Sequence, residues 1–468
     1  MNADVVIVGG GPVGMTMSIA CSRLGLSNVV IEREPEAFPL PRAIVMDAEV
    51  HRSLLRHDLG VSLQRCLSPM VAADFVDSSG AQLMGIELAG INLFGVPAVS
   101  RHYQPELESM LRADALRRGA TLRLGCTALR LEQSPTSAVV TCDDGSVYEA
   151  KWVVGCDGAS SFVRKSVGIT LDDLGFDQDW LVVDLLVPDK LRSGLPDVTR
   201  QVCDRERPTT LVSGHRDYYR FEFQLQPGED PAAMRDDDTV WRLLSPWIAR
   251  KHAQIVRTAT YRFHAVVATS LRAERVFIAG DAAHQMPPFM GQGLNSGMRD
   301  VFNLAWKLAL VTRGAAAEHL LDTYELERIP HARGTVAESV ETGRLIDQLA
   351  GRSSHGVSAE AGYGGARRSL AFREGVVVGE AAGVGAPFGA LDMVPGEGLD
   401  DFVAVSHAES GRLPVDRLLR TLVVSHDVML GGDVVFVRPD GYVGAVSTFE
   451  NAAETWHALR RAACLVGA

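Results

Sequence analysis

Three glycines near the start of the chain, Gly9, Gly11 and Gly14, have the G-x-G-x-x-G spacing of a dinucleotide-binding turn, with Pro12 and Val13 inside it. In such a turn one glycine allows the tight bend, one lets the backbone approach a pyrophosphate, and one lets helix and strand pack closely. Glu32 follows, and a carboxylate at that place suits a ribose with a free 2′-hydroxyl. The pattern therefore predicts a site for FAD or NAD rather than NADP.

The flanking sequence predicts the strand, helix and strand that position these residues. Residues 5–8 are an apolar, β-branched run typical of a strand buried on both faces of a parallel sheet. Residues 15–24 have a helical pattern that Gly25 ends, and residues 28–31 form a second apolar strand. A helix that begins here directs its free amide groups at phosphates.

Two later segments place polar residues after predicted strands. Asp157 and Arg164 lie in the loop that follows the strand at 152–154, where open α/β sheets hold ligands; a plain turn capped by a serine is the alternative. Asp281 follows a strand at 276–279. Residues 287–297 then combine two prolines with a glycine turn before a helix predicted at 298–312. This predicts a second helix N-terminus with free amides for another electron-rich group of the same cofactor.

Composition limits the class of protein. The chain has 468 residues, which is too long for one ordinary core and predicts two or three domains. No apolar run of about 18 residues occurs, so we predict no membrane span, no signal peptide and a cytoplasmic location. A net charge of -12 without a basic patch argues against a nucleic-acid partner. The seven cysteines form no C-x-x-C pair, so no metal site or dithiol centre is predicted.

Three separated motifs occur in a fixed order: the glycine triplet with Glu32, C-D-G-x-x-S-x-x-R at 156–164, and G-D-x-x-H at 280–284 followed by Pro287 and G-x-G-x-N at 291–295. Together they resemble the motifs of the single-component FAD-dependent aromatic hydroxylases. Longer stretches, such as HYQPELE and GQGLNSGMRDVFNLAWKLALV, are similar to the branch that includes 3-(3-hydroxyphenyl)propionate hydroxylase. The likeness covers roughly residues 3–345.

The resemblance implies an α/β fold, with a Rossmann-like FAD-binding domain, an inserted mostly β substrate domain and a short C-terminal thioredoxin-like remnant. We predict the FAD-binding domain at 1–74, 101–178 and 269–350, and the substrate domain at 75–100 and at 179–268, where strand patterns dominate. A glycine-rich connection at 351–387 leads to the C-terminal part at 388–468. That part is interpreted as structural or as a subunit contact, which leaves a homodimer open.

The resemblance also implies roles for matching residues. Glu32 binds the adenosine ribose, Arg42 and Gln104 lie along the pyrophosphate and ribityl chain, and Asp281 holds a ribityl hydroxyl. Asp157 and Arg164 belong to a loop associated with both FAD and nicotinamide, and Arg164 is assigned mainly to the nicotinamide. The predicted FAD-binding set is Gly9, Gly11, Pro12, Val13, Gly14, Glu32, Arg33, Arg42, Gln104, Cys126, Asp157, Arg164, Asp281, Pro287, Gly291, Gly293, Leu294 and Asn295.

The chemistry implied by the resemblance is that NADH or NADPH, bound transiently, reduces FAD, which reacts with O2 to form a C4a-hydroperoxide that hydroxylates a small phenolic substrate. Glycines 291, 293 and 297 are expected to leave room for the flavin to move. The phenol needs a proton acceptor or hydrogen-bond partner, and the candidates are Asp47, His215, Tyr218 and Tyr219. Because Tyr218 and Tyr219 are neighbours in a strand, at most one is expected to face the substrate.

Three alternatives accompany this hypothesis. A flavin halogenase is disfavoured because no W-x-W-x-I-P sequence occurs. An oxygenase of a larger, polyketide-like natural product stays open, since the β module that forms the pocket is variable. A non-catalytic flavin-binding protein would contain the same cofactor motifs, and substrate-stimulated oxidation of NADH or NADPH would distinguish an enzyme from it.

Overall fold

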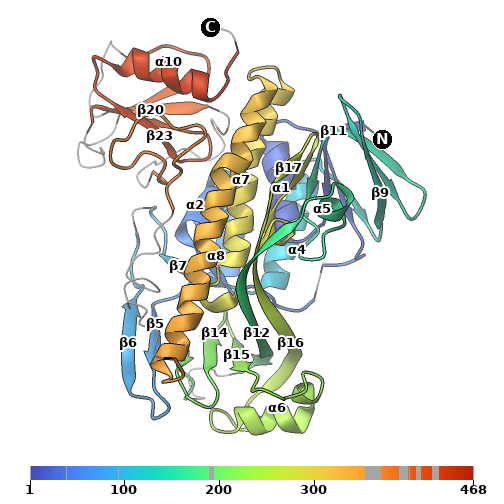
Figure 1. Ribbon diagram of the computed structural model, residues 1–468, viewed down its shortest axis with the longest axis vertical. Coiled ribbons are helices and arrows are strands. Elements are labelled where there is room, and N and C mark those ends of the chain that lie inside the picture. The colour runs from blue at the N-terminus through green and yellow to red at the C-terminus, as the bar shows by residue number, and fades with distance from the viewer. Residues whose placement is uncertain are drawn as a thin grey trace.

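The computed structural model describes residues 2–37, 39–92, 94–188, 194–353, 370–388, 399, 401–406, 413–423 and 432–466. Residues 354–369 of the predicted connection and parts of the predicted C-terminal region lie outside this described part. The described residues form two large sheets, two small sheets and the helices that pack on them (Figure 1).

The first large sheet contains the dinucleotide-binding strand. Its order is β17 (Arg272–Ala273), β18 (Val276–Ile278), β11 (Val147–Gly155), β1 (Asn2–Val8), β2 (Asn28–Glu32) and β8 (Thr121–Leu124). From β18 to β8 all neighbours are parallel. The antiparallel strands β10 (Ala138–Cys142) and β9 (Ala128–Gln133) extend from β11. Residues 5–8 are buried at the centre of this sheet, as their apolar run predicts.

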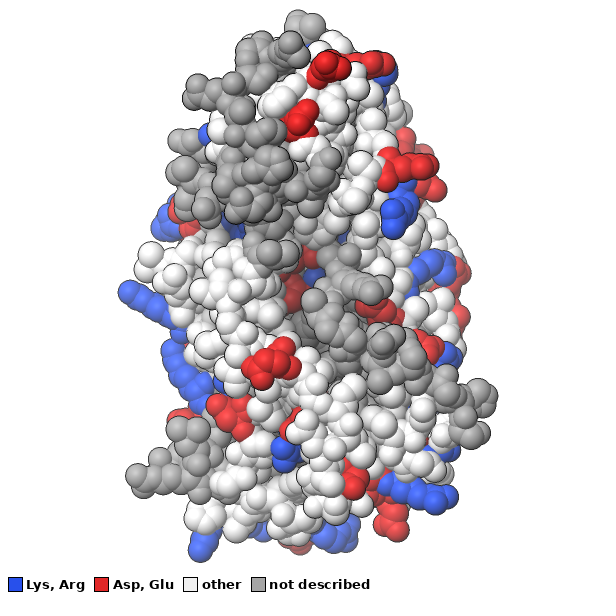
Figure 2. All heavy atoms as spheres, turned by 90° about the vertical axis from the view of Figure 1, so that its left-hand side faces the viewer, with Lys and Arg blue, Asp and Glu red and all other residues white. Residues whose placement is uncertain are grey.

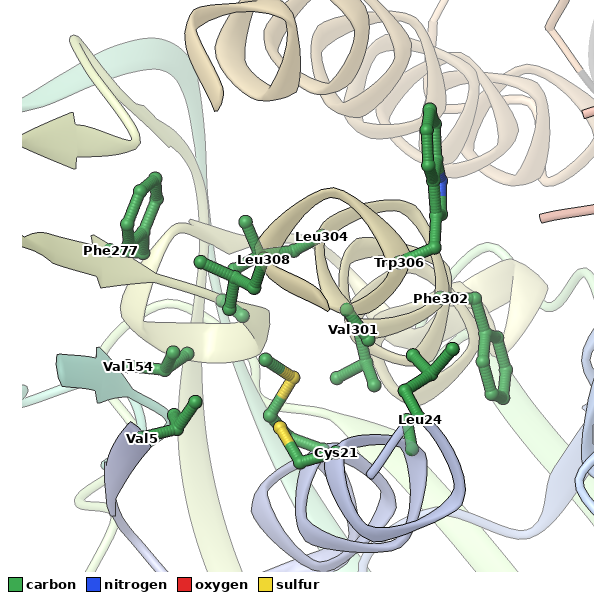
Figure 3. Close-up of a cluster of buried hydrophobic side chains, with 14 of the residues drawn as sticks. Val5, Cys21, Leu24, Val154, Phe277, Val301, Phe302, Leu304, Trp306 and Leu308 are labelled. Atoms are coloured by element: carbon green, nitrogen blue, oxygen red, sulfur yellow. The ribbon is translucent and has the colours of Figure 1, made fainter. Parts of the chain in front are cut away.

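Helices α1 (Pro12–Arg23) and α7 (Gln292–Thr312) pack together on this sheet. Figure 3 shows Cys21 and Leu24 facing Val301 and Phe302 of α7, while Leu304 and Leu308 lie toward the sheet. Helix α4 (Gln104–Arg117) also contacts α1, and α5 (Phe162–Ser166) follows β11. Each large side chain that is fully buried in this way contributes roughly 1.5–3 kcal/mol, so the core holds the N-terminal ends of α1 and α7 in fixed positions.

The second large sheet is mostly antiparallel. Its order is β19 (His284–Gln285), β16 (Gln254–Ala268), β12 (Leu171–Leu186), β15 (Tyr218–Gln224), β14 (Thr209–Ser213), β13 (Thr199–Val202), β5 (Ala72–Val76) and β6 (Gln82–Glu87). The long strands β12 and β16 pair from Leu171 to Leu186 and connect this sheet to the first (Figure 1). One face packs on α6 (Asp237–Leu244) around aromatic residues of β15. Residues of the other face line a cavity.

Smaller elements connect the two large sheets. One is a three-stranded sheet of β3 (Val45–Asp47), β7 (Val99–His102) and β4 (Leu67–Pro69). In the sequence, helix α2 (Ala48–Arg56) directly follows β3, and helix α3 (Gly60–Cys66) directly precedes β4. The C-terminal unit combines β21 (Leu419–Val423), β20 (Phe402–Ser406), β22 (Val434–Val437) and β23 (Val443–Ser447) with α10 (Ala452–Ala462). Helix α8 (Thr323–Leu349) runs from beside this unit to the second large sheet (Figure 1).

Buried charges attach the C-terminal unit to the rest. Glu327 of α8 accepts hydrogen bonds from Arg438 and from Lys307 of α7, each at 2.8 Å. Burial alone would raise the pKa of Glu327, but the two cations overcome it and lower the pKa to about 2. The ion pairs therefore fix the unit against both long helices.

The predicted α/β fold class is confirmed, with one helix boundary corrected. The sequence predicts the long helix at 298–312, but α7 begins at Gln292, because Gly291 adopts φ 62° and caps the helix there. Within the described part of the chain, no helix combines the length and apolar character needed to cross a membrane. Acidic and basic side chains are interspersed on the face shown in Figure 2.

Candidate active site

One cavity of about 690 Å³ lies between the two large sheets and the N-terminal ends of α1 and α7. One wall consists of loops from the first sheet and its helices, and the other consists of side chains from the second sheet. The first wall includes Gly11, Pro12, Val13, Arg42, Gln104, Gly158, Asp281, Pro287, Gly291, Gly293 and Leu294; the second includes Met70, Ala73, Ile86, Leu88, Thr199, Thr210, Val212, Arg220 and Glu222. The predicted cofactor segments and the β module thus share one cavity.

The three glycines of the first turn have different environments. Gly9 has φ 105°, and a Cβ there would overlap the carbonyl of Cys156. A Cβ on Gly14 would overlap the carbonyl oxygen of Gly9, so this glycine lets α1 approach β1. Gly11 lines the cavity and has no neighbouring atom within 4 Å of a Cβ position. It caps α1 without a side-chain hydrogen bond, so the first amides of the helix stay available to a phosphate.

Glu32, Arg33 and Cys126 lie at the outer end of this turn. Glu32 accepts hydrogen bonds from the Gly10 amide at 2.5 Å and the Glu34 amide at 2.8 Å. The Cys126 amide donates to the carbonyl of Glu32 at 3.0 Å, and exposed Arg33 pairs with Glu34. These three described residues are outside the cavity wall, so their contact with adenosine stays a prediction.

Arg42 and Gln104 line the cavity where the chain passes between the sheets. Gln104 accepts a hydrogen bond from the Ala43 amide at 2.6 Å, and its own amide donates to Glu108 at 2.6 Å. Arg220 donates to the carbonyl of Arg42 at 2.5 Å. These bonds fix the backbone of this segment beside the cavity and leave the Arg42 side chain exposed there.

The loop after β11 is held by Asp157 and Arg164. Asp157 accepts hydrogen bonds from the Ser161 hydroxyl at 2.5 Å and the Val163 amide at 3.0 Å. Arg164 is buried, and its guanidinium donates to the carbonyls of Ala282 and Ala159, each at 3.0 Å. Arg164 therefore joins this loop to the turn after β18, and its role toward a nicotinamide stays a prediction.

The turn that precedes α7 forms the floor of the same cavity. Asp281, Pro287, Gly293 and Leu294 line it, and the first turn of α7 has no side-chain cap. Asn295 is buried behind this turn, where its amide donates to the Gly291 carbonyl at 2.7 Å and its oxygen accepts from the Asp47 amide at 3.0 Å. The free amides near Leu294 suit an electron-rich ring oxygen.

The expectation that three glycines leave room for a moving ring is corrected in part. Only Gly293 has open space at its Cβ position. A Cβ on Gly291 would overlap Val45, and one on Gly297 would lie 2.8 Å from Val13 and 2.9 Å from Gly280. Gly291 and Gly297 therefore allow close packing around α7, because helix and turn leave no space for a side chain there.

None of the four predicted catalytic residues, all within the described part of the chain, lines the cavity. Asp47 caps α2 by accepting from Val50 and pairs with Arg299. His215 is buried beside Ser68, with 3.0 Å between Nδ1 and the hydroxyl oxygen. Tyr218 stacks on Tyr103, and Tyr219 donates to the Pro196 carbonyl at 2.9 Å from within the apolar core. All four side chains therefore lie outside the cavity wall, where they make local packing contacts or hydrogen bonds.

The polar residues that do face the cavity from the second sheet are Thr199, Thr210, Arg220 and Glu222. The sequence analysis missed them because it followed the aromatic residues of the strand at 218–224. The alternation of residues in this strand could have identified them. Arg220 and Glu222 share one face of the sheet, and the aromatic residues Tyr219, Phe221 and Phe223 share the opposite face.

Comparison with known proteins settles the family. A family model described as FAD binding domain matches residues 2–339. The chain belongs to this family. A probable NADH-specific resorcinol 4-hydroxylase of Rhodococcus jostii is 38% identical over 354 residues, which cover 73% of this chain and 65% of that relative. A 3-(3-hydroxy-phenyl)propionate/3-hydroxycinnamic acid hydroxylase of Escherichia coli is 32% identical over 352 residues, covering 74% and 62%. The chain thus spans somewhat less than two thirds of the length of these relatives.

Solved structures have a similar fold over nearly the full length of the chain. Aklavinone-11 hydroxylase, in a ternary complex with FAD and aklavinone, has a TM-score of 0.83 at 22% identity, with 99% of each chain covered. The flavin-dependent monooxygenase PieE, with FAD and substrate, has a TM-score of 0.82 at 21% identity and the same coverage. The likeness in fold therefore extends beyond the residues that the family model matches, to the C-terminal unit.

The cavity of this FAD-binding chain fits its cofactor. The open space at Gly11 lies in front of the free amides of α1, as a pyrophosphate requires. The second uncapped helix end, at α7, opens into the same cavity and suits the flavin ring. The predicted cofactor, FAD, is thus supported both by the family and by two uncapped helix ends that open into one cavity.

Proposed function

We propose that the protein is a monooxygenase that uses FAD, NADH or NADPH, and O2 to hydroxylate a phenolic aromatic substrate. The observation that supports this most strongly is the single cavity, in which helix ends suited to FAD face an apolar sheet surface. Flavin sites and aromatic sites that share a cavity bring a reactive ring and its substrate together. Two relatives are named as hydroxylases of resorcinol and of a hydroxyphenylpropionate, and these names favour a substrate with one phenolic ring.

The residues of the chain bind FAD, orient the substrate ring and exclude water from the cavity. The amides of α1 hold the pyrophosphate, and those near Leu294 face the flavin ring. Met70, Ala73, Ile86 and Leu88 give the opposite wall an apolar surface that a substrate ring can cover. Bound FAD would supply the redox and oxygen chemistry, and the apolar residues of this wall would limit the access of water to it.

The relatives favour a small phenol over a polyketide-like substrate, which is the alternative that the fold permits. A homodimer and a cytoplasmic location stay predictions, and sizing of the purified protein tests the first.

Function is tested by incubating the FAD-loaded protein with NADH, or with NADPH, and a panel of phenols. We expect phenol-stimulated oxidation of the nicotinamide and a product heavier by one oxygen. FAD binding without either result would favour a non-catalytic flavoprotein.

A further inference from the structure

Strand β15 places charged residues on the face that lines the cavity. Tyr219, Phe221 and Phe223 are buried in the core under the second sheet. Arg220 and Glu222 alternate with them and form part of the cavity wall. Buried charges need partners, because desolvation without hydrogen bonds is costly. The partners of these two residues differ.

The guanidinium of Arg220 makes its hydrogen bonds within the protein. Its guanidinium donates to both carboxylate oxygens of Asp184, at 2.7 and 3.2 Å. It also donates to the carbonyls of Arg42, at 2.5 Å, and Pro41, at 3.0 Å. These four bonds orient the guanidinium toward β12 and the segment at 41–42, so it supports the wall rather than presenting free donors.

Glu222 is only 6% exposed, and no described residue donates a hydrogen bond to its carboxylate. Its nearest cationic atom is Nη1 of Arg220, at 3.8 Å. Buried carboxylates are normally satisfied by hydrogen bonds. Since Glu222 lines the cavity, a hydrogen-bond donor of a bound ligand can satisfy it there.

The neighbours of Glu222 make it a better base than an exposed carboxylate. Burial raises the pKa of Glu222, and Asp184 of β12 raises it further. Arg220 of the same strand and Arg257 of β16 lower it, and the balance lies above the ordinary value of 4.5. A base whose pKa approaches the working pH accepts a phenolic proton more readily.

Glu222 is the carboxylate that the second sheet contributes to the cavity wall. Besides Glu222, Glu338 of α8 contributes a carboxylate to the wall. The exposed guanidinium of Arg42 also lines the cavity, and its charge offsets part of the burial that raises the pKa of Asp281. A substrate carboxylate close to Glu222 would therefore meet a like charge.

We infer that Glu222 accepts the hydrogen bond of the substrate's phenolic hydroxyl and takes its proton during hydroxylation, and that the site selects uncharged phenols over phenols bearing a carboxylate. This inference rests on the proposed function. In the step, the phenolic O–H bond breaks and the proton moves to a carboxylate oxygen of Glu222. The electron pair stays on the phenol oxygen and enriches the ring at the carbon to be hydroxylated.

The first test measures binding and needs no turnover. The FAD-loaded protein is titrated with 3-(3-hydroxyphenyl)propionate and with its methyl ester, which has the same ring without the charge, and the flavin spectrum reports binding. We expect the wild type to prefer the ester by about tenfold, corresponding to about 1.4 kcal/mol, and Glu222→Gln to reduce that preference. Glu87→Gln, which removes an exposed carboxylate from the same sheet, should change nothing. A wild type that prefers the acid, or an unchanged preference in Glu222→Gln, would overturn the inference.

The second test follows product formation from resorcinol against pH. Wild-type kcat should rise with pH through the ionisation of Glu222. In Glu222→Gln this rise of kcat with pH should disappear, and kcat should be roughly a hundredfold lower than in the wild type. KM should stay within a few-fold of the wild-type value, because the amide oxygen of the glutamine still accepts a hydrogen bond. If Glu222→Gln keeps both the rise of kcat with pH and the wild-type kcat, the role of Glu222 is refuted.

Two results keep this inference separate from the proposed function. A wild type that forms no oxygenated product refutes the function, while the binding preference still decides the role of Glu222. Glu222→Asp retains the charge on a shorter side chain. It should keep the ester preference and lose rate, and it replaces Glu222→Gln if that variant does not retain FAD.

Discussion

Gly11 allows cofactor binding to be separated from folding. Gly11 has φ -73° and ψ -175°, which any residue adopts, and its Cβ position has no atom within 4 Å. Gly11→Val should therefore fold normally, with apo stability within about 1 kcal/mol of wild type. Its side chain would occupy the space in front of the α1 amides. Losing two charge-assisted hydrogen bonds at roughly 1.5–3 kcal/mol each weakens FAD binding by more than about a hundredfold.

Gly14→Ala is the matched contrast. Its Cβ would overlap the Gly9 carbonyl, so this variant should be destabilised by roughly 1–3 kcal/mol or more through overpacking. Both variants are purified, stripped of FAD and compared by thermal unfolding and by fluorescence titration with FAD. Retention of wild-type affinity in Gly11→Val would refute the assigned pyrophosphate position. An equal loss of apo stability in both variants would refute the separate roles of the two glycines.

Three further predictions concern stability, pH and reduction. Glu327→Gln leaves Arg438 and Lys307 buried without their carboxylate, and thermal unfolding should show a loss of about 3–5 kcal/mol; an unchanged melting curve would contradict this. Because the pKa of Glu327 is lowered to about 2, its stabilisation is complete above the ordinary value of 4.5 and lost as the pH falls toward 2, so acid titration should lower wild-type stability more than that of Glu327→Gln. Stopped-flow reduction of bound FAD by NADH should be at least about tenfold faster with a true substrate, about 1.4 kcal/mol in barrier, and equal rates would exclude coupling.

Local patterns predicted the cofactor side of the site because its determinants are close in sequence. The glycine triplet, the strand before it and Glu32 are sufficient to predict a phosphate site at one helix end. The start of α7 was predicted six residues late because the left-handed conformation of Gly291, which lets the helix begin at once, cannot be read from residue type alone.

The substrate side depends on contacts between distant segments. Asp47 was a plausible base until its partner Arg299, 252 positions away in the sequence, was placed beside it. Glu222 could be assigned to one of two strand faces from its alternation with aromatic residues. Which face meets the cavity is decided only by how β12, β15 and α6 pack.

The central claim is that this cavity activates O2 with FAD and transfers one oxygen atom to a phenol. It is tested most directly by incubating the FAD-loaded protein with NADH, resorcinol and O2 enriched in oxygen-18, followed by mass analysis of the product. The account predicts a hydroxylated product with one oxygen-18 atom and none when only the water is labelled. Oxidation of NADH that yields hydrogen peroxide alone with every neutral phenol, or a product oxygen derived from water, would contradict it.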